Sequence, residues 1–197
     1  MTHQLYLCRH GETAWNAERR FQGQVDIPLD ALGRNQAKRN GRYLRNVLGS
    51  SASEFGFLSS PLGRSVETMR IIRYELGLEP DDFARDDRLK EVHFGDWQGS
   101  TLIELEARLP GVSAQRSADK WNFLPPGLGA ETLADLERRV APVFEGFDRP
   151  MIVTAHGGVT RAYLRRFAGW SEREAARIDV PQDRILAITG EGRVDWV

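Results

Sequence analysis

The sequence has almost no cysteine and almost no net charge. One cysteine among 197 residues excludes an internal disulfide framework and fits a reducing compartment. A formal net charge of −1 gives no electrostatic reason to expect nucleic-acid or membrane partners. The N-terminus lacks a basic region followed by a long apolar stretch, so it predicts neither a signal peptide nor a membrane-spanning helix. We therefore expect a cytoplasmic protein that binds neither nucleic acid nor membrane.

Several motifs of phosphate chemistry and metal binding are missing as well. No G-x-x-x-x-G-K-[ST] occurs, which excludes a P-loop, and the PGLGAE of residues 126–131 lacks the last glycine of a dinucleotide-binding fingerprint. Cys8 has no arginine where the loop of a cysteine phosphatase needs one, and we interpret it as a small core residue. His93 and Asp96 form no close cluster with other ligand-type residues, so we predict no metal site and no cofactor.

What the sequence does contain is an alternation of short apolar runs and helical patterns. Its 197 residues, 41% of them hydrophobic, suit one α/β domain, which we place over residues 1–197. Strands that alternate with helices predict a three-layer sandwich with helices on both faces of a mostly parallel central sheet. The predicted strands are residues 5–8, 55–59, 151–155, 185–189 and 194–197, and the predicted helices are residues 32–48, 61–76, 132–147 and 159–167.

The ends of two predicted helices and one irregular segment carry further signals. Ser60 before Pro61 suggests an N-cap followed by a proline at the first helical position. Thr132 and Asp135 have the spacing of a capping box. Between residues 86 and 130 the alternation stops, and the segment is rich in proline, glycine, tryptophan and charge. We interpret it as a small lid-like excursion from the sheet that covers a site.

Three predicted strands lead into residues that suit an anion. Ligands of open α/β sheets bind beyond the carboxyl ends of the strands. His10 follows the first strand, and His156 with Gly157 follows the strand MIVTA. Arg64 lies in the first turn of the helix after the second strand, and arginine binds phosphate oxygens in pairs. Because glycine lets the backbone approach a ligand and a helix N-terminus directs N–H groups at it, we predict a phosphate site at this edge.

The block around His10, LCRHGETAWN, resembles the signature of the histidine phosphatase superfamily, the phosphoglycerate-mutase-like proteins. This sequence departs from the family pattern at two positions. Gln98 stands where many members have glutamate, and Glu131 lies in a looser form of a Gly-Gly-Glu-Ser pattern. The roles of these two residues stay open. Five further blocks follow in the family's order: RFQGQVDIPLDALGRNQA at 20–37, SSPLGRSVET at 59–68, LKEVHFGDWQG at 89–99, PPGLGAET at 125–132 and TAHGGVTR at 154–161.

The resemblance implies a role for each matching residue. His10 is the nucleophile that accepts the phosphoryl group, and Glu91 stands at the position of the family's proton donor. Around them, Arg9, Arg64 and His156 surround the phosphoryl oxygens, while Asn16, Gln22 and Gly23 contact phosphate or substrate.

The implied chemistry is physically reasonable. A neutral imidazole is nucleophilic near neutral pH, because the pKa of an unperturbed histidine is about 6.5, and a phosphohistidine divides transfer into two easier steps. Arg9, Arg64 and a protonated His156 would stabilise the transferring group. Glu91 would protonate the leaving alkoxide and then accept a proton from the attacking water. These steps require no metal, because the arginines take its electrostatic role.

We therefore predict a phosphomonoester hydrolase that acts on a small phosphorylated metabolite. Only residues 100–126 separate the LKEVHFGDWQG block from the Pro-Gly segment, whereas the family's glycolytic mutases have a larger insertion there. A small lid admits water and favours hydrolysis. The alternatives are a bisphosphoglycerate-primed phosphoglycerate mutase and a phosphate-binding module that has lost catalysis. The intact catalytic set counts against the module.

The lid leaves substrate identity open. Arg116 and Lys120 have two interpretations, contacts for a second anionic group or a solvated loop. Trp121 and Phe123 either contact an apolar or ring portion of the substrate or pack into the core. Sugar phosphates, nucleotides, phosphoglycerate and cobalamin-pathway phosphates are all compatible with the sequence, and oligomeric state is not predicted.

Overall fold

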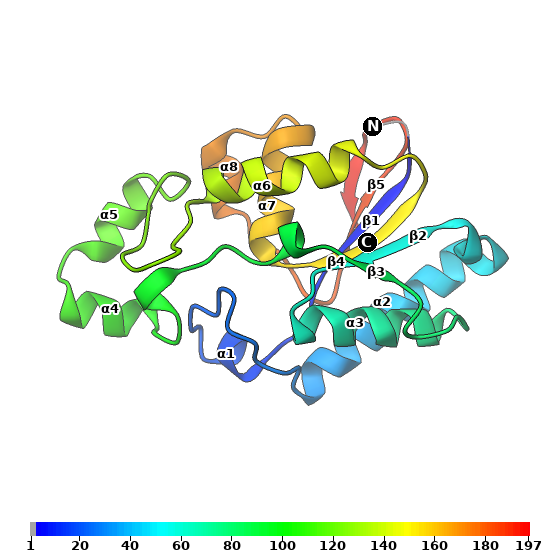
Figure 1. Cartoon of the computed structure of the whole chain (residues 1–197), viewed down its shortest axis with the longest axis horizontal. Coiled ribbons are helices and arrows are strands. Elements are labelled where there is room, and N and C mark those ends of the chain that lie inside the picture. Colours follow the sequence, from blue (N-terminus) through cyan, green and yellow to red (C-terminus); the bar gives the residue numbers. More distant parts are fainter. Residues whose placement is uncertain (1–2) are drawn as a thin grey trace.

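The computed structural model describes residues 3–197 as a three-layer α/β structure around a six-stranded sheet (Figure 1). The strand order is β3-β2-β4-β1-β5-β6, in which β3, β2, β4 and β1 are parallel, β5 pairs antiparallel with β1, and β6 pairs antiparallel with β5. The predicted mostly parallel sheet is confirmed. The strands are β1 Leu5–Arg9, β2 Gly56–Ser59, β3 Ala84–Arg85, β4 Met151–Ala155, β5 Ile185–Ile188 and β6 Val194–Trp196.

Helices cover both faces of the sheet, as Figure 1 shows. One face packs against α2 (Ala31–Leu48) and α3 (Gly63–Glu75), and the other against α6 (Leu133–Glu145), α7 (Gly157–Phe167) and α8 (Glu172–Arg177). The short 3-10 helix η1 (Gly49–Glu54) connects α2 to β2. Both faces of the central strands are therefore buried, which explains why those strands are short continuous apolar runs.

Strand β1 illustrates this two-sided burial. Leu5 and Leu7 pack in the core beneath α6 and α7, whereas Tyr6 and Cys8 pack in the core beneath α2 and α3. The period-2 alternation of a strand puts successive side chains on opposite faces. Cys8 is fully buried, as predicted for a core residue, and burial raises the pKa of its thiol to about 12. It is therefore an unreactive packing residue.

The segment after β3 leaves the sheet, as predicted for residues 86–130. It contains the 3-10 helices η2 (Asp87–Leu89) and η3 (Gly95–Trp97) and the helices α4 (Leu102–Arg108) and α5 (Val112–Ala118). In Figure 1 α4 and α5 extend away from the sheet, and they enclose a small core of their own built on Trp97, Leu105 and Val112. These short helices, like α1 (Ala14–Ala17) and α8, were not predicted.

Two helix starts differ from the sequence prediction. Helix α3 begins at Gly63 and has no side-chain cap, so Ser60 and Pro61 lie before it instead of opening it. The Ser60 hydroxyl pairs with a histidine, described below. Helix α7 begins at Gly157, two residues earlier than expected, directly after His156. By contrast, the predicted capping box of Thr132 and Asp135 is confirmed at the start of α6.

Candidate active site

A pocket of about 210 Å³ opens at the carboxyl ends of the parallel strands. Arg9 ends β1 and His10 follows it, Gly157 follows β4, and Arg64 follows β2 at the start of α3. All four line the pocket, at the edge where the strand pattern predicts a ligand site. Of the other predicted site residues, Asn16, Gln22, Gly23 and Glu91 also line it, whereas His156 does not line it but packs against the His10 ring.

His10 is fixed by the backbone at the bottom of this pocket, where it is 3% exposed. Its N–H donates to the Ala155 carbonyl at 3.0 Å, which joins the ends of β1 and β4. On the ring, Nδ1 lies 2.7 Å from the Gly11 carbonyl, so we assign the proton to Nδ1 and the lone pair to Nε2. Burial, then Arg64 and Arg9, holds the pKa of His10 well below its usual value, and the imidazole is neutral.

Arg64 is a fully buried cation that connects the nucleophile to the loop before α2. Its Nε lies 3.2 Å from His10 Nε2, and its two terminal nitrogens donate to the carbonyls of Val25 and Gly23 at 2.7 Å each. Gly23 has a φ of +54°, and a Cβ there would meet Gln98 Oε1 at 2.1 Å. Gln98, whose role the sequence left open, also accepts the N–H of residue 24 and thereby shapes this loop.

The His156 ring is held by a hydrogen bond at Nε2, whereas the His10 ring is held at Nδ1. Its Nε2 lies 2.8 Å from the Ser60 hydroxyl, while its buried Nδ1 has no hydrogen-bond partner in the described chain. The rings of His10 and His156 are 5.2 Å apart. Burial, followed by Arg64, His10 and Arg9, keeps the pKa of His156 well below its usual value. In the free protein the His156 ring is therefore neutral, and a protonated His156 beside a transferring phosphoryl group stays a prediction.

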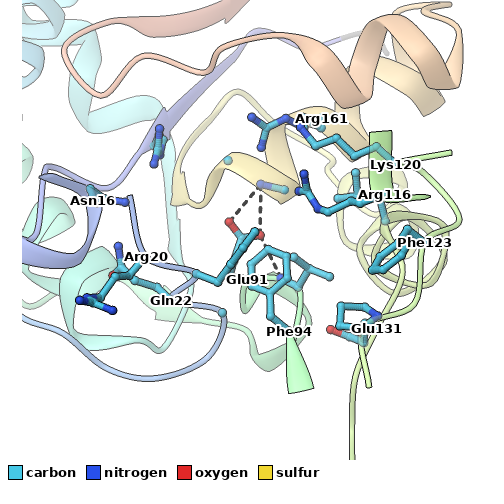
Figure 2. Close-up of a pocket in the computed structure, with 18 of the residues that line it drawn as sticks. Asn16, Arg20, Gln22, Glu91, Phe94, Arg116, Lys120, Phe123, Glu131 and Arg161 are labelled. Atoms are coloured by element: carbon cyan, nitrogen blue, oxygen red, sulfur yellow. Dashed lines mark hydrogen bonds between the residues drawn. The ribbon is translucent and has the colours of Figure 1, made fainter. Parts of the chain in front are cut away.

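Glu91 reaches the pocket from the opposite side, and Figure 2 shows its carboxylate against the start of α7. The Gly158 N–H donates to both carboxylate oxygens at 3.1 Å, and the Val92 N–H donates to Oε1 at 2.9 Å. A Cβ at Gly158 would lie 2.2 Å from Glu91 Oε1, so the second glycine of the His-Gly-Gly motif makes room for this carboxylate. Oε2 has fewer protein donors and is the freer oxygen.

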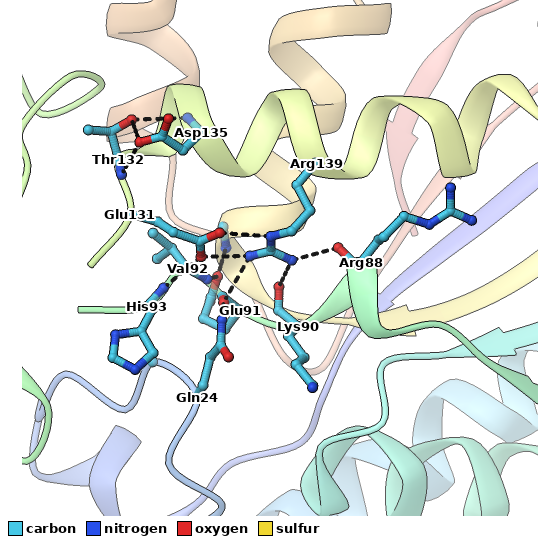
Figure 3. Close-up of polar contacts among 12 residues, drawn as sticks. Gln24, Arg88, Lys90, Glu91, Val92, His93, Glu131, Thr132, Asp135 and Arg139 are labelled. Atoms are coloured by element: carbon cyan, nitrogen blue, oxygen red, sulfur yellow. Dashed lines mark hydrogen bonds and ion pairs between the residues drawn. The ribbon is translucent and has the colours of Figure 1, made fainter. Parts of the chain in front are cut away.

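The main chain that carries Glu91 is fastened by an ion pair that sequence reasoning missed (Figure 3). Arg139 of α6 pairs with Glu131 at 2.7 Å and donates to the carbonyls of Arg88, Lys90 and Glu91. Glu131 in turn accepts the N–H of residue 93 at 3.0 Å. The open role of Glu131 is thus answered in part: it lines the pocket while it neutralises Arg139. The eight-residue spacing of this pair in PGLGAETLADLERR gives no signal until α6 is in place.

A second missed residue, Gln182, supports the other side. Its side-chain amide donates to the His10 carbonyl at 3.1 Å and to Asn16 Oδ1 at 3.0 Å. With its oxygen occupied, Asn16 has its NH₂ group left to offer to a ligand. Gln22 is 6% exposed, and its buried Oε1 has no partner within residues 3–197.

Two sequence candidates fall outside the pocket. Asp96 is exposed and does not line it, and His93 accepts the N–H of Gly95 instead. Trp121 is 2% exposed in the main core, whereas Phe123 lines the pocket and packs against Trp97.

Over residues 3–197 no three His, Cys, Asp or Glu side chains gather as a metal site would need. In the same range, no helix is both long and apolar enough to cross a bilayer.

The pocket is strongly cationic. Six arginine and lysine side chains line it against two glutamates, and one of these glutamates is already paired with Arg139. Buried positive charge of this kind favours an anionic ligand, since the pocket walls screen charges less than water does. The cations are Arg9, Arg20, Arg64, Arg116, Lys120 and Arg161.

Comparison with known proteins agrees with this geometry. The family model of the histidine phosphatase superfamily (branch 1) matches residues 5–194. A glucosyl-3-phosphoglycerate phosphatase of Mycolicibacterium vanbaalenii is 32% identical, over 98% of this chain and 82% of the relative. A 2,3-bisphosphoglycerate-dependent phosphoglycerate mutase of Bifidobacterium longum is 30% identical, over 92% of this chain and 83% of the relative.

A solved structure extends the similarity to the whole fold. The native structure of a mycobacterial glucosyl-3-phosphoglycerate phosphatase superposes with a TM-score of 0.76 at 28% identity, over 98% of this chain and 97% of that chain. The predicted α/β class and the resemblance stated from the sequence are both confirmed. With its strand-end histidines, its buried arginines and a family match that spans nearly its full length, the chain belongs to the histidine phosphatase superfamily.

Proposed function

We propose that the protein hydrolyses phosphomonoesters of small metabolites through a phosphohistidine on His10. The observation that carries this proposal is the state of the His10 ring, with Nδ1 bonded to the Gly11 carbonyl and Nε2 facing Arg64. In the free protein the Nε2 lone pair of this neutral imidazole accepts the Arg64 Nε–H at 3.2 Å, and it can attack phosphorus once Arg64 donates to the phosphoryl oxygens instead. The full-length similarity to phosphatases supports the same reaction class.

In the first step His10 Nε2 forms a bond to phosphorus as the bond to the leaving oxygen breaks. Arg9 and Arg64 offer positive charge, and His156 offers its Nδ1 proton, to the oxygens of the transferring group. Glu91 delivers a proton to the leaving alkoxide. We assign this proton to Oε2, since Oε1 already accepts two backbone N–H groups.

In the second step water attacks the phosphohistidine. The deprotonated Glu91 accepts a proton from the water, the N–P bond breaks, and the electron pair returns to His10 Nε2. Inorganic phosphate leaves, and the proton on Glu91 restores the enzyme for the next turnover. Arginines supply the positive charge throughout, so the steps need no metal ion.

The substrate we propose first is an ester of the kind that the phosphatase relatives are named for, glucosyl-3-phosphoglycerate. The second candidate function is a bisphosphoglycerate-primed mutase, favoured by the mutase relative at 30% identity. The short segment of residues 100–126 supports hydrolysis over mutase action, because it forms only two short helices next to the pocket. A single cysteine, which fits a reducing compartment, supports a cytoplasmic location.

The test is turnover of p-nitrophenyl phosphate and of 3-phosphoglycerate, with and without a bisphosphoglycerate primer. We expect phosphate release without primer, and loss of that release in His10→Ala. His3→Ala, which changes a histidine outside the pocket, is the matched control and should keep wild-type activity. Persistent turnover in purified His10→Ala would contradict the proposal, and isomerisation that depends on the primer would favour the mutase.

A further inference from the structure

Two side-chain amides connect the backbone of the nucleophile to the edge of the pocket. Gln182 lies in the loop between α8 and β5, and its NH₂ group donates to the His10 carbonyl at 3.1 Å and to Asn16 Oδ1 at 3.0 Å. Asn16 lines the pocket, and Figure 2 shows it on the side away from Phe123. Gln182 does not line the pocket, so it acts there only through the groups that it bonds.

Backbone groups at the two ends of this connection fix the direction of both amides. A carbonyl oxygen only accepts, so the atom of Gln182 that faces the His10 carbonyl is its nitrogen. A backbone N–H only donates, and the Thr13 N–H lies 3.3 Å from the side-chain oxygen of Asn16. Turning either amide over would bring two acceptors or two donors face to face. The arrangement therefore leaves the NH₂ group of Asn16 directed at a ligand.

Helix α1, which carries Asn16, gives this side chain little support of its own. The helix has four residues, Ala14–Ala17, none of them buried, and so short a helix is marginal without tertiary contacts. Its capping box joins Asn16 to Thr13, within the same short segment. Across residues 3–197, Gln182 is the one hydrogen-bond partner of the Asn16 amide from outside this capping box. It is therefore Gln182 that holds the amide to the nucleophile.

The loop that carries Gln182 is fastened at two points. The Gln182 carbonyl accepts the side-chain NH₂ of Asn40, which belongs to α2 and is 2% exposed. Two residues earlier, the Val180 carbonyl accepts Arg9 Nη1 at 2.7 Å. One short stretch of chain thus holds Arg9 directly and Asn16 through Gln182, and both of these residues line the pocket.

We propose that Gln182 is a positioning residue for phosphoryl transfer, which holds the Asn16 amide with its NH₂ group toward the phosphoryl oxygens. One side chain then holds both the nucleophile His10 and this hydrogen-bond donor, so a phosphoryl group meets them in a fixed relation. The inference rests on the proposed phosphatase function and adds to it a residue that touches neither the substrate nor the reacting atoms.

The experiment is a double-mutant cycle of Gln182→Met and Asn16→Ala, measured by calorimetric binding of inorganic phosphate and by kcat/KM for p-nitrophenyl phosphate. Asn16→Ala should lower both affinity and kcat/KM about 10- to 100-fold, the effect of one hydrogen bond to a charged group. Gln182→Met should lower them about 3- to 10-fold, because the Asn16 amide can then turn. In the Asn16→Ala background the same change should cost less than about twofold, since the amide through which it acts is gone.

Gln182→Glu tests the direction of the two amides, and it completes the cycle if Gln182→Met does not fold. An ionised carboxylate has no hydrogen to donate, so it would face two oxygens and favour an Asn16 amide that is turned over. The loss should exceed that of Gln182→Met, and the excess should disappear in the Asn16→Ala background. An excess that persists there would be repulsion of phosphate by the new charge, which would contradict an action through Asn16.

The matched control is Gln36→Met. Gln36 accepts the Glu12 N–H at 2.8 Å, so it also supports the segment after β1, but it does not bond Asn16. Its effect should be equal in the two backgrounds. Thermal unfolding checks that each variant folds. Phosphate binding needs no turnover, so coupling in binding without hydrolysis of any ester would contradict the phosphatase function and support this inference. Equal costs of Gln182→Met in the two backgrounds, or unchanged phosphate binding in Asn16→Ala, would overturn the inference.

Discussion

The two ends of the pocket are built in opposite ways. At the nucleophile end two key side chains are held by backbone groups: His10 by the Gly11 carbonyl, and Arg64 by two carbonyls of the loop before α2. At the lid end the Arg116 guanidinium lies over an aromatic ring and Lys120 donates to one backbone carbonyl. No carboxylate among the described residues pairs with either side chain. Rigid placement suits chemistry that depends on geometry, whereas unbalanced charge suits recognition of a ligand that balances it.

The largest effect should come from breaking the nucleophile end at Arg64. Arg64→Gln removes the cation beside His10 Nε2 and the hydrogen bonds to Gly23 and Val25. We expect kcat to fall by about 10²–10³-fold on every ester, whatever its second group. Arg73→Gln is the matched control, because Arg73 is a buried arginine of the same helix that does not line the pocket. It should lower the melting temperature and spare the activity of the folded protein, and equal activity losses in both variants would mean that Arg64 is only structural.

Next in size is Glu91→Gln, which keeps the shape of the side chain but cannot cycle a proton. Phosphorylation by an alkyl ester should slow by about 10²–10⁴-fold, because a poor leaving group needs its proton most. Phosphorylation by p-nitrophenyl phosphate should slow far less, and a burst of p-nitrophenol should precede slow hydrolysis. Rapid mixing measures both. If phosphorylation by the two esters slows equally, Glu91 only positions the substrate and does not transfer a proton.

A smaller effect should separate two adjacent buried hydroxyls. Ser60 bonds His156 Nε2, whereas Ser59 bonds Ser65 and the Ser60 carbonyl. Ser60→Ala should lower kcat/KM by about 2- to 10-fold and shift the proton of neutral His156 between its two ring nitrogens. Ser59→Ala, the control, should leave the tautomer unchanged. The ¹⁵N chemical shifts of the His156 ring report the tautomer directly, and an identical spectrum in Ser60→Ala would remove this role.

The smallest effect should come from a chelator. Arginine and lysine side chains supply the positive charge of the pocket at both ends. Prolonged incubation with EDTA should therefore leave kcat/KM within about twofold of its starting value, since no step relies on a metal as Lewis acid. A large loss of activity that a divalent cation restores would contradict this prediction.

More of the nucleophile end than of the lid end could be predicted from the sequence, for a physical reason. His10, Arg64 and His156 each follow a short apolar strand, and parallel strands bring their carboxyl ends to one edge. Strand periodicity is local, so this convergence is readable from the chain. The supports Arg139, from α6, and Gln182, from the loop before β5, act across long sequence separations that no local pattern reveals.

The helices of the lid could not be predicted from the sequence, for a related reason. Its helices α4 and α5 have seven residues each and are stabilised by packing on Trp97 more than by any long periodic pattern. Ser60 was misassigned as an N-cap because Ser-Pro before a helical pattern is a good local signal. In the folded chain the Ser60 hydroxyl forms a hydrogen bond with His156 instead. Such an exchange is visible only when β2 and β4 lie side by side.

If the phosphoryl group passes through Nε2 of His10, the phosphorylated enzyme can be trapped and the phosphorylated atom identified. Glu91→Gln, which should accumulate the intermediate, is mixed with labelled p-nitrophenyl phosphate and quenched in alkali. The site of the label is then read by ³¹P and ¹⁵N NMR. We expect an acid-labile, alkali-stable phosphohistidine on His10 Nε2, because Nδ1 is bonded to the Gly11 carbonyl. Phosphate on Nδ1, on His156 or on a residue other than histidine would contradict it.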